Sequence, residues 1–255
     1  MASPALTDIS RADRTLDVPP VKRVDHGPPP QFMPLRMNET LSMEPRVPPK
    51  GEVFVFRFRS QWQRISAHDA ATWLTQDETR RAALLPSPAL RYRYISSRAV
   101  LRLAVARLFG CEPSAVDLRD DAKGRLLAQA TGINTVLCAD IGYAGVWIML
   151  AISAAQVGLG TSLPSFGSGS DAPLSDTASP LPFGRQRARD NSLLSAAGHR
   201  SATDNPDSAD DLAANGAWYV FDLPMPGQLC ASICSLTPMN TIHAFGWSKR
   251  NENGR

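Results

Sequence analysis

The residues that could do chemistry are concentrated between Asp77 and Arg107. This stretch holds two acidic residues and seven arginines, so its local net charge is +5; the arginines are Arg80, Arg81, Arg91, Arg93, Arg98, Arg102 and Arg107. A guanidinium group donates paired hydrogen bonds in the planar geometry that a phosphate accepts. The stretch therefore predicts a surface for a nucleotide, a coenzyme phosphate or a nucleic-acid backbone. The alternative is a solvated helix face.

The cysteines and histidines provide no metal or redox motif. The four cysteines form no C-x-x-C pair, and the four histidines are scattered without the spacing of metal ligands. These spacings exclude zinc-finger, thioredoxin-like and H-E-x-x-H sites. Cys230 and Cys234 fall on one face of an expected strand, where two buried free thiols are the ordinary interpretation.

The arginines lie on helices whose ends are marked in the sequence. Ser66 is a good N-cap for a short helix through Leu74, and Thr75 with Glu78 has the spacing of a capping box for the next helix. A long helix is expected from residue 89 to 109, because apolar side chains recur there at helical spacing and Gly110 follows as the terminating glycine.

Short β-branched and aromatic runs predict strands on both sides of these helices. In the run 51–58, Val53, Val55 and Arg57 fall on one face, and the three phenylalanines fall on the other. The other expected elements are a strand, a tight turn and a return strand in 115–128, buried strands at 146–152 and from 157, and a hairpin in 217–236. Helices and strands in this order indicate the α+β class.

Composition divides the chain into five parts. Ten of the 21 prolines lie in residues 1–50, which are expected to be a disordered N-terminal arm. Residues 51–163 form the main lobe. Residues 164–216, here called the serine-rich segment, are expected to be a low-complexity linker or insert, with a functional lid as the alternative. Residues 217–240 form a C-terminal hairpin that completes the fold, and residues 241–255 form a tail.

The charge and hydropathy pattern limit the class of protein further. The net charge of +3 is too small to imply a nucleic-acid partner by itself. There is no run of 18 apolar residues, and no apolar stretch follows a basic start, so neither a membrane span nor a secretory signal is expected. A cytoplasmic protein is the simplest prediction.

The order of the short motifs resembles that of the Sfp-type 4′-phosphopantetheinyl transferases. The strings DETRRAALL, YISSRAVLRLAVARLFGCEPSAVDL and KGRLLA follow one another as in that family, and the later WYVFDLPMPGQLCASI is similar to its closing strands. Arg98 to Arg102 read R-A-V-L-R, where the family has R-x-x-L-R. Gly124 and Arg125 fill the family's G-K/R-P turn, with Leu126 in place of the proline.

The resemblance implies a fold, an activity and a set of binding residues. The fold would be a pseudo-twofold pair of α+β lobes, here with an incomplete second lobe, and coenzyme A would lie in the cleft between them. Such enzymes move the phosphopantetheine arm of coenzyme A to a serine of an acyl or peptidyl carrier protein, with Mg²⁺ clamping the diphosphate. By position, Arg81, Arg102 and Arg125 would hold the 3′-phosphate. Tyr143 takes the place of a phosphate-binding histidine and could donate a hydrogen bond but carry no positive charge.

The sequence departs from the family where the metal should bind. Gly160 and Ser162 replace the two carboxylates of the G-V-D-x-E motif, and the W-x-x-K-E-A string is absent between residues 164 and 217. No catalytic residue or metal ligand is therefore assigned, and Mg²⁺-dependent transfer is expected to be absent or slow. Gly160→Asp with Ser162→Glu is expected to raise the affinity for Mg²⁺.

Three functions stay open at this point. The chain could be a weak phosphopantetheinyl transferase, or a non-catalytic protein that binds coenzyme A or a carrier protein. A nucleic-acid-binding module that uses the basic helix is less favoured, because only Tyr92 and Tyr94 offer aromatic rings for base stacking there.

Overall fold

The computed structural model describes residues 28–42, 44–62, 65–163, 180–198 and 217–247. Within these residues the chain forms four α-helices and ten strands in two sheets, which confirms the α+β class. None of the helices in these ranges is long and apolar enough to cross a membrane.

The larger sheet has seven strands in the order β1-β10-β2-β6-β5-β4-β3. The first three strands of this order run parallel, and the other neighbours pair antiparallel. The strands are β1 (Gln31–Leu35), β2 (Glu52–Arg59), β3 (Val116–Asp120), β4 (Leu126–Ala130), β5 (Val136–Ala144), β6 (Trp147–Ser153) and β10 (Thr241–Phe245). The tight turn expected at residues 121–124 joins β3 to β4, as predicted.

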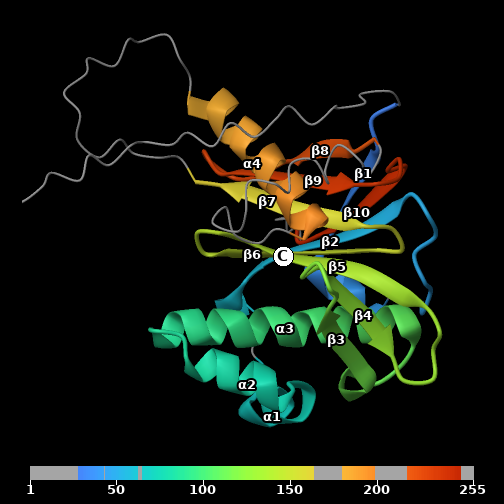
Figure 1. The fold of residues 1–255 in the computed structure, drawn as a ribbon, viewed down its shortest axis with the longest axis vertical. Helices are drawn as coiled ribbons and strands as arrows, with labels where there is room; N and C mark the ends of the chain where they lie inside the picture. The colour runs from blue at the N-terminus through green and yellow to red at the C-terminus, as the bar shows by residue number, and fades with distance from the viewer. Residues whose placement is uncertain (1–27, 43, 63–64, 164–179, 199–216, 248–255) are drawn as a thin grey trace, which may run out of the picture.

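The long helix α3 (Pro88–Phe109) covers one face of this sheet (Figure 1). It begins after the N-cap Ser87 and ends at Gly110, whose φ of 68° lies in the left-handed region that glycine adopts without strain. The phenylalanines of β2 point toward α3 and bury themselves with its apolar side chains, among them Leu101 and Val105. The expected helix and the expected two faces of the first strand are thus confirmed.

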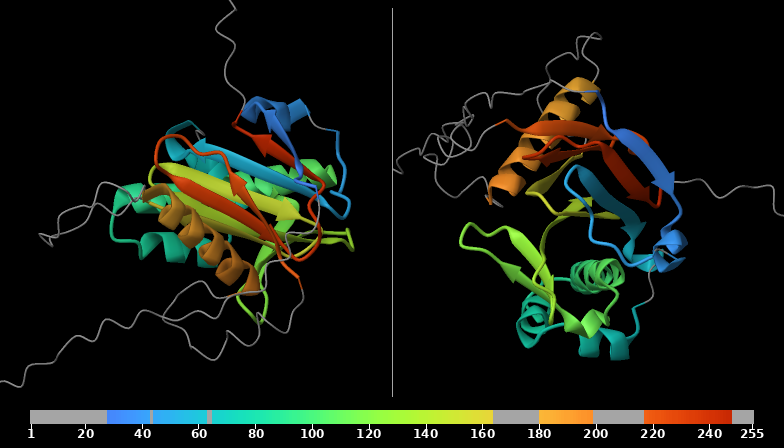
Figure 2. Two further views of the ribbon diagram at one scale, coloured as in Figure 1. Left: turned by 90° about the horizontal axis from the view of Figure 1, so that it is seen from above. Right: turned by 90° about the vertical axis from the view of Figure 1, so that its right-hand side faces the viewer.

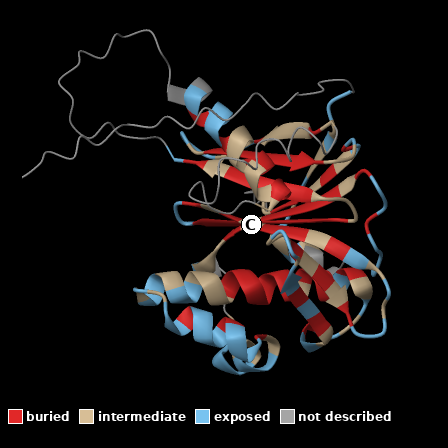
Figure 3. Ribbon diagram, in the orientation of Figure 1, coloured by how far each residue is buried: buried red, intermediate tan, exposed pale blue. Residues whose placement is uncertain are grey.

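Two short helices lie on the outer side of α3. They are α1 (Ala67–Trp73), capped by Ser66, and α2 (Gln76–Ala83), which begins with the capping box of Thr75 and Glu78. Figure 3 shows that their outer surfaces are exposed, whereas the middle of α3 is buried. The basic residues of this region are therefore divided between an exposed and a buried environment.

The smaller sheet has the order β7-β9-β8, with all pairs antiparallel. Its strands are β7 (Val157–Ser162), β8 (Tyr219–Leu223) and β9 (Cys230–Ser235), and the pairing of β8 with β9 confirms the expected hairpin. One face packs on the larger sheet, where Val53 and Val55 meet Ile233, and helix α4 (Pro180–Ala197) covers the other face. Figure 2 shows the resulting order of layers: helix, sheet, sheet, helix.

Three of the compositional predictions need correction. The N-terminal arm is not wholly disordered, because residues 31–35 form β1 and residues 37–42 form a 3-10 helix. The tail contributes β10, which lies between β1 and β2. The serine-rich segment contains α4; its remaining residues, 164–179 and 199–216, and the arm's residues 1–27 lie outside the described residues.

Local sequence explains why the first of these elements was missed. Pro34 is the fourth of the five residues of β1, and proline normally argues against a strand because it donates no backbone hydrogen bond. An edge strand tolerates proline, and β1 is the edge of the larger sheet.

Candidate functional site

Three polar side chains, those of Arg93, Ser97 and Tyr143, meet between the first half of α3 and strand β5. The charge of Arg98 acts on the Tyr143 phenol from the neighbouring position on α3; we call the four residues the Arg98 cluster. The Tyr143 hydroxyl lies 2.9 Å from the Ser97 hydroxyl oxygen. The Arg93 guanidinium stacks over the Tyr143 ring, 4.6 Å from its centroid, and donates to the Gly145 carbonyl at 3.0 Å. The cluster therefore combines hydroxyl donors with two cations.

Helix and strand periodicity bring these residues together. Arg93 and Ser97 are four residues apart on α3, so they lie on one face of the helix. Alternate residues of β5 point to opposite faces of the sheet. Tyr143 belongs to the face that packs toward α3, together with Leu137 and Ala139.

Arg98 is the buried member of the cluster, with a relative exposure of 6%. Its Nε lies 3.9 Å from a carboxylate oxygen of Glu78 and has no hydrogen-bond partner within the described part of the chain. The Arg98 guanidinium also lies over the Tyr94 ring, 5.6 Å from the centroid. Neither contact gives this buried cation a close anionic partner.

Glu78 is already occupied by other donors. Two nitrogens of the Arg102 guanidinium lie 3.0 and 2.8 Å from the two carboxylate oxygens, and the Thr75 backbone amide donates to one of these oxygens at 3.0 Å. Two buried guanidinium groups thus share one carboxylate, which leaves a net charge of +1. A buried charge without a close partner is unfavourable, so an anion bound beside Arg98 would be stabilised.

Tyr143 is a neutral hydrogen-bond donor at physiological pH. Burial raises the pKa of its phenol, although the hydrogen bond with Ser97 and the charges of Arg98 and Arg93 act in the opposite direction. A neutral phenol next to two cations can donate to a phosphate oxygen. The cluster can therefore bind an anion, and the Glu78 carboxylate beside Arg98 is paired with Arg102.

Each of the three arginines expected to hold a phosphate lies beside a carboxylate of the chain. Arg102 is 1% exposed, and besides Glu78 its Nε donates to the Val116 carbonyl at 3.3 Å. A ligand phosphate could reach Arg102 only by displacing Glu78. The expectation that the Arg102 guanidinium is available to a phosphate is therefore corrected, because its contacts give it a structural role.

Arg81 and Arg125 lie near the turn between β3 and β4. Arg81 is exposed, 3.7 Å from Asp120, and Arg125 is paired with Asp121. Burial opposes ionisation of Asp121, but the hydrogen bonds and charge of Arg125 outweigh it and lower the pKa of this carboxyl. No described contact joins either arginine to Tyr143, which is the one predicted binding residue within the Arg98 cluster.

The positions of the expected metal motif face helix α4. Asn191 of this helix donates to the Thr161 carbonyl at 2.9 Å. A β-carbon added at Gly160 would overlap the backbone of Ala188 and Ser192. Strand β7 therefore has room for glycine alone at this position.

A carboxylate at residue 160 cannot be accommodated, which corrects the expectation that Gly160→Asp would raise Mg²⁺ affinity. The parts of the chain that the structure describes contain no group of three histidine, cysteine or carboxylate side chains that could hold a metal ion.

Sequence reasoning counted Arg93 and Arg98 in the basic stretch but assigned neither as a binding residue, and it missed Ser97. The available signal was the spacing of Arg93 and Ser97 together with the position of Arg98 at the start of the R-A-V-L-R string.

Comparison with protein-family models finds no match for this chain, and neither does a search of the curated proteins.

Proposed function

We propose that the chain binds coenzyme A through one of its phosphates at the Arg98 cluster and does not transfer the phosphopantetheine arm. The observation that carries the proposal is the buried Arg98 guanidinium, whose Nε has no hydrogen-bond partner among the described residues. The choice of coenzyme A rests on the resemblance of the motifs in residues 51–163 to the phosphopantetheinyl transferases.

The composition of the cluster favours a phosphate over other anions. Arg93 and Arg98 supply two positive charges, and a phosphate monoester carries nearly two negative charges at neutral pH. Ser97 and Tyr143 add hydroxyl donors at the same place. Arg93 and Tyr143 are half-buried, so a ligand can reach the cluster from solvent.

The packing of α4 on β7 supports the part of the proposal that excludes transfer. In the family that the motifs resemble, a divalent cation would neutralise the diphosphate while the carrier serine attacks the phosphate that bears pantetheine, the P–O bond within the diphosphate breaks and 3′,5′-ADP leaves. Without that electrostatic stabilisation the rate would fall on the order of a thousandfold or more. Gly160 cannot be replaced by a ligand, because the α4 backbone occupies the space.

The order of layers supports the proposal that the fold is a pair of α+β lobes. Helix α3 with the larger sheet and helix α4 with the smaller sheet form two α+β units that pack sheet against sheet. This arrangement is compatible with a pseudo-twofold pair of lobes whose second lobe is incomplete. An acyl or peptidyl carrier protein is the macromolecular partner that the resemblance implies.

Calorimetric titration with coenzyme A, dephospho-coenzyme A and pantetheine tests the binding proposal. We expect coenzyme A to bind and pantetheine, which has no phosphate, to bind far more weakly. Arg93→Gln should weaken coenzyme A about tenfold or more, the range of a hydrogen bond to a charged group, and Tyr143→Phe should weaken it less. Arg91→Gln is the matched control, because Arg91 is exposed on the same helix.

Three outcomes would contradict the proposal. Equal affinity for coenzyme A and pantetheine would show that the chain does not recognise the phosphates of coenzyme A. Transfer of the arm to an apo carrier protein with Mg²⁺, detected by mass spectrometry as added mass, would show that the chain is an active enzyme. Tight oligonucleotide binding that weakens steeply with salt would instead favour the nucleic-acid function.

A further inference from the structure

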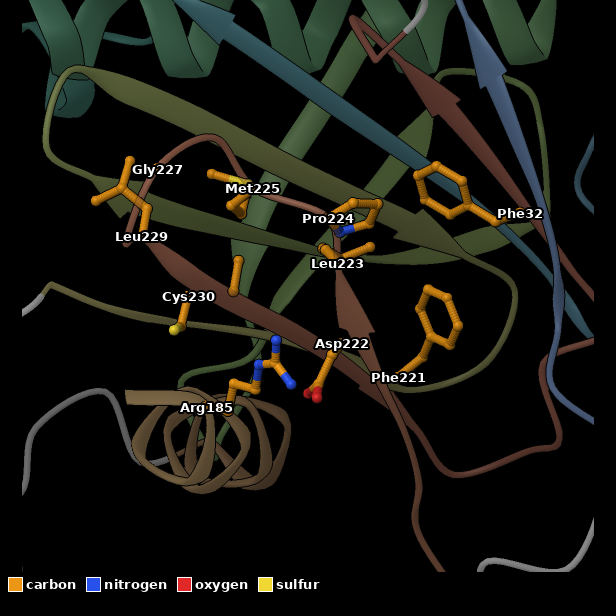
Figure 4. A pocket seen from close by; sticks show the side chains of 11 residues that line it. Phe32, Arg185, Phe221, Asp222, Leu223, Pro224, Met225, Gly227, Leu229 and Cys230 are labelled. Carbon is orange, nitrogen blue, oxygen red and sulfur yellow. The ribbon is translucent and has the colours of Figure 1, made fainter. Parts of the chain in front are cut away.

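A second concave region lies where the edges of the two sheets meet (Figure 4). It is a pocket of about 480 Å³ between β1, the hairpin of β8 and β9, and helix α4. Volumes of this order are typical of sites for small organic molecules. None of the residues that the sequence suggested for binding lines it.

The walls of the pocket are mostly apolar. At one end Phe32 of β1 stacks on Phe221 of β8, with ring centroids 6.0 Å apart and planes 24° apart. At the other end are Met225 and Leu229 of the β8–β9 turn, with Leu223 between the two ends (Figure 4). An apolar body of a ligand would be removed from water between these side chains.

The polar side of the pocket has a surplus positive charge. Arg189 donates to both oxygens of Asp222, at 2.7 and 2.5 Å, and Ser232 donates to one of them at 2.8 Å. Burial opposes ionisation of Asp222, but these hydrogen bonds outweigh it and lower its pKa. Asp222 is therefore an anion whose charge is already balanced by Arg189.

Arg185 is the second cation at this position. It lies one turn before Arg189 on α4, is exposed, and projects toward the pocket beside Asp222 (Figure 4). Its charge attracts Asp222 at longer range, but it forms no ion pair or hydrogen bond with the residues that the structure describes. Burial raises the pKa of the nearby Cys230 thiol, so this group adds no negative charge.

From this combination we propose that the pocket binds a small amphiphile with an apolar chain and a single carboxylate. The chain lies against Phe32, Phe221 and Leu223, and the carboxylate pairs with Arg185. A guanidinium fork matches the two oxygens of a carboxylate. The pocket lies on the opposite side of the larger sheet from α3 and the Arg98 cluster, so this site does not depend on the proposed function.

Titration with octanoate, followed by calorimetry and by the NMR signals of the phenylalanine rings, tests the proposal. We expect saturable binding with shifts of the Phe32 and Phe221 signals, and no displacement by coenzyme A. Arg185→Gln should weaken octanoate about fivefold, the upper range for an exposed ion pair, and leave the binding of 1-octanol unchanged. Arg187→Gln is the matched control, because Arg187 is exposed on the same helix and does not line the pocket.

A change in the apolar wall should give a different pattern. Leu229→Ser, in the turn between β8 and β9, should weaken octanoate and octanol alike. The proposal is overturned if octanoate does not saturate, if Arg185→Gln and Arg187→Gln weaken it equally, or if coenzyme A displaces it. A circular dichroism spectrum of each variant establishes that the chain is folded before the titration is compared.

Discussion

Arg98 and Arg102 lie one turn apart on the same face of α3 and approach the same carboxylate, that of Glu78, at different distances. Arg102 has Glu78, whose position is set by the capping box of α2, whereas Arg98 reaches the same carboxylate only at 3.9 Å. The R-A-V-L-R string suggested Arg102 as the ligand-binding residue. The packing of α2 on α3 leaves Arg98 as the arginine with charge available to a ligand.

Removal of Arg102 is expected to destabilise the fold. Arg102→Met leaves the Glu78 carboxylate buried with only the distant Arg98, so the free energy of unfolding should fall by about 3 kcal/mol, the lower range for breaking a buried pair. Urea denaturation measures this change. The double variant Arg102→Met with Glu78→Leu should recover much of the loss, and a double variant as unstable as the single one would contradict the explanation.

The pair of Asp222 with Arg189 predicts a pH dependence of stability. The pKa of Asp222 in the folded chain is lowered, so its contribution is fully present above the unfolded value, about 3.9. It is lost as the pH falls toward the folded value. Between pH 6 and pH 3, wild type should lose about 1 kcal/mol more than Asp222→Asn in urea denaturation. Asp117→Asn, at an exposed carboxylate of β3, should follow the wild type.

At the scale of elements, α4 and β7 depend on each other. The helix contains Pro182 and Gly184 in its first turns, and isolated helices of this composition are unstable in water. Burial of Ala188, Leu193 and Ala196 against the smaller sheet stabilises it. Close approach requires glycine on the facing strand, since a β-carbon at Gly158 or Gly160 would overlap the α4 backbone.

Gly160→Ala should therefore loosen α4 specifically. Overpacking of this kind costs about 1–3 kcal/mol, and the overlap with backbone atoms places the expected loss at the upper end. Hydrogen exchange should become faster along α4 and unchanged in α3. Ser162→Ala is the matched control on the same face of β7 and should leave both helices protected; equal effects of the two substitutions would argue against the packing explanation.

At the scale of the whole molecule, the larger sheet is built from strands of both halves of the chain. Strand β10 lies between β1 and β2 and pairs in parallel with both, so residues near 35, 55 and 245 become neighbours. Ile242 is buried in the core between the two sheets, and Phe245 stacks on Phe56 in the core under α3. Residues 241–245 thus belong to both main cores.

A chain that ends after residue 240 should fail to fold cooperatively. It lacks the strand between β1 and β2 and exposes Phe54 and Phe56 to water. A chain that ends after Trp247 keeps all three strands and is the comparison, and calorimetry measures its unfolding temperature. Cooperative unfolding of the shorter chain near that temperature would show that the fold does not require β10.

Local signals in the sequence determined much of the fold. The starts of α1 and α2, the end of α3, the two faces of β2 and the hairpin of β8 and β9 follow from capping residues, a terminating glycine and alternating apolar residues, which act within a few residues of chain. The class α+β follows from the order of these elements.

Tertiary structure alone decided the elements and site residues that depend on distant partners. Strand β1 tolerates Pro34 because it is an edge, β10 exists because β1 and β2 flank it, and α4 is stable because Gly158 and Gly160 let it approach β7. The sequence alone likewise does not determine whether the charge of an arginine is available to a ligand. Its availability depends on whether a carboxylate lies within hydrogen-bond distance after folding, which separates Arg102 from Arg98.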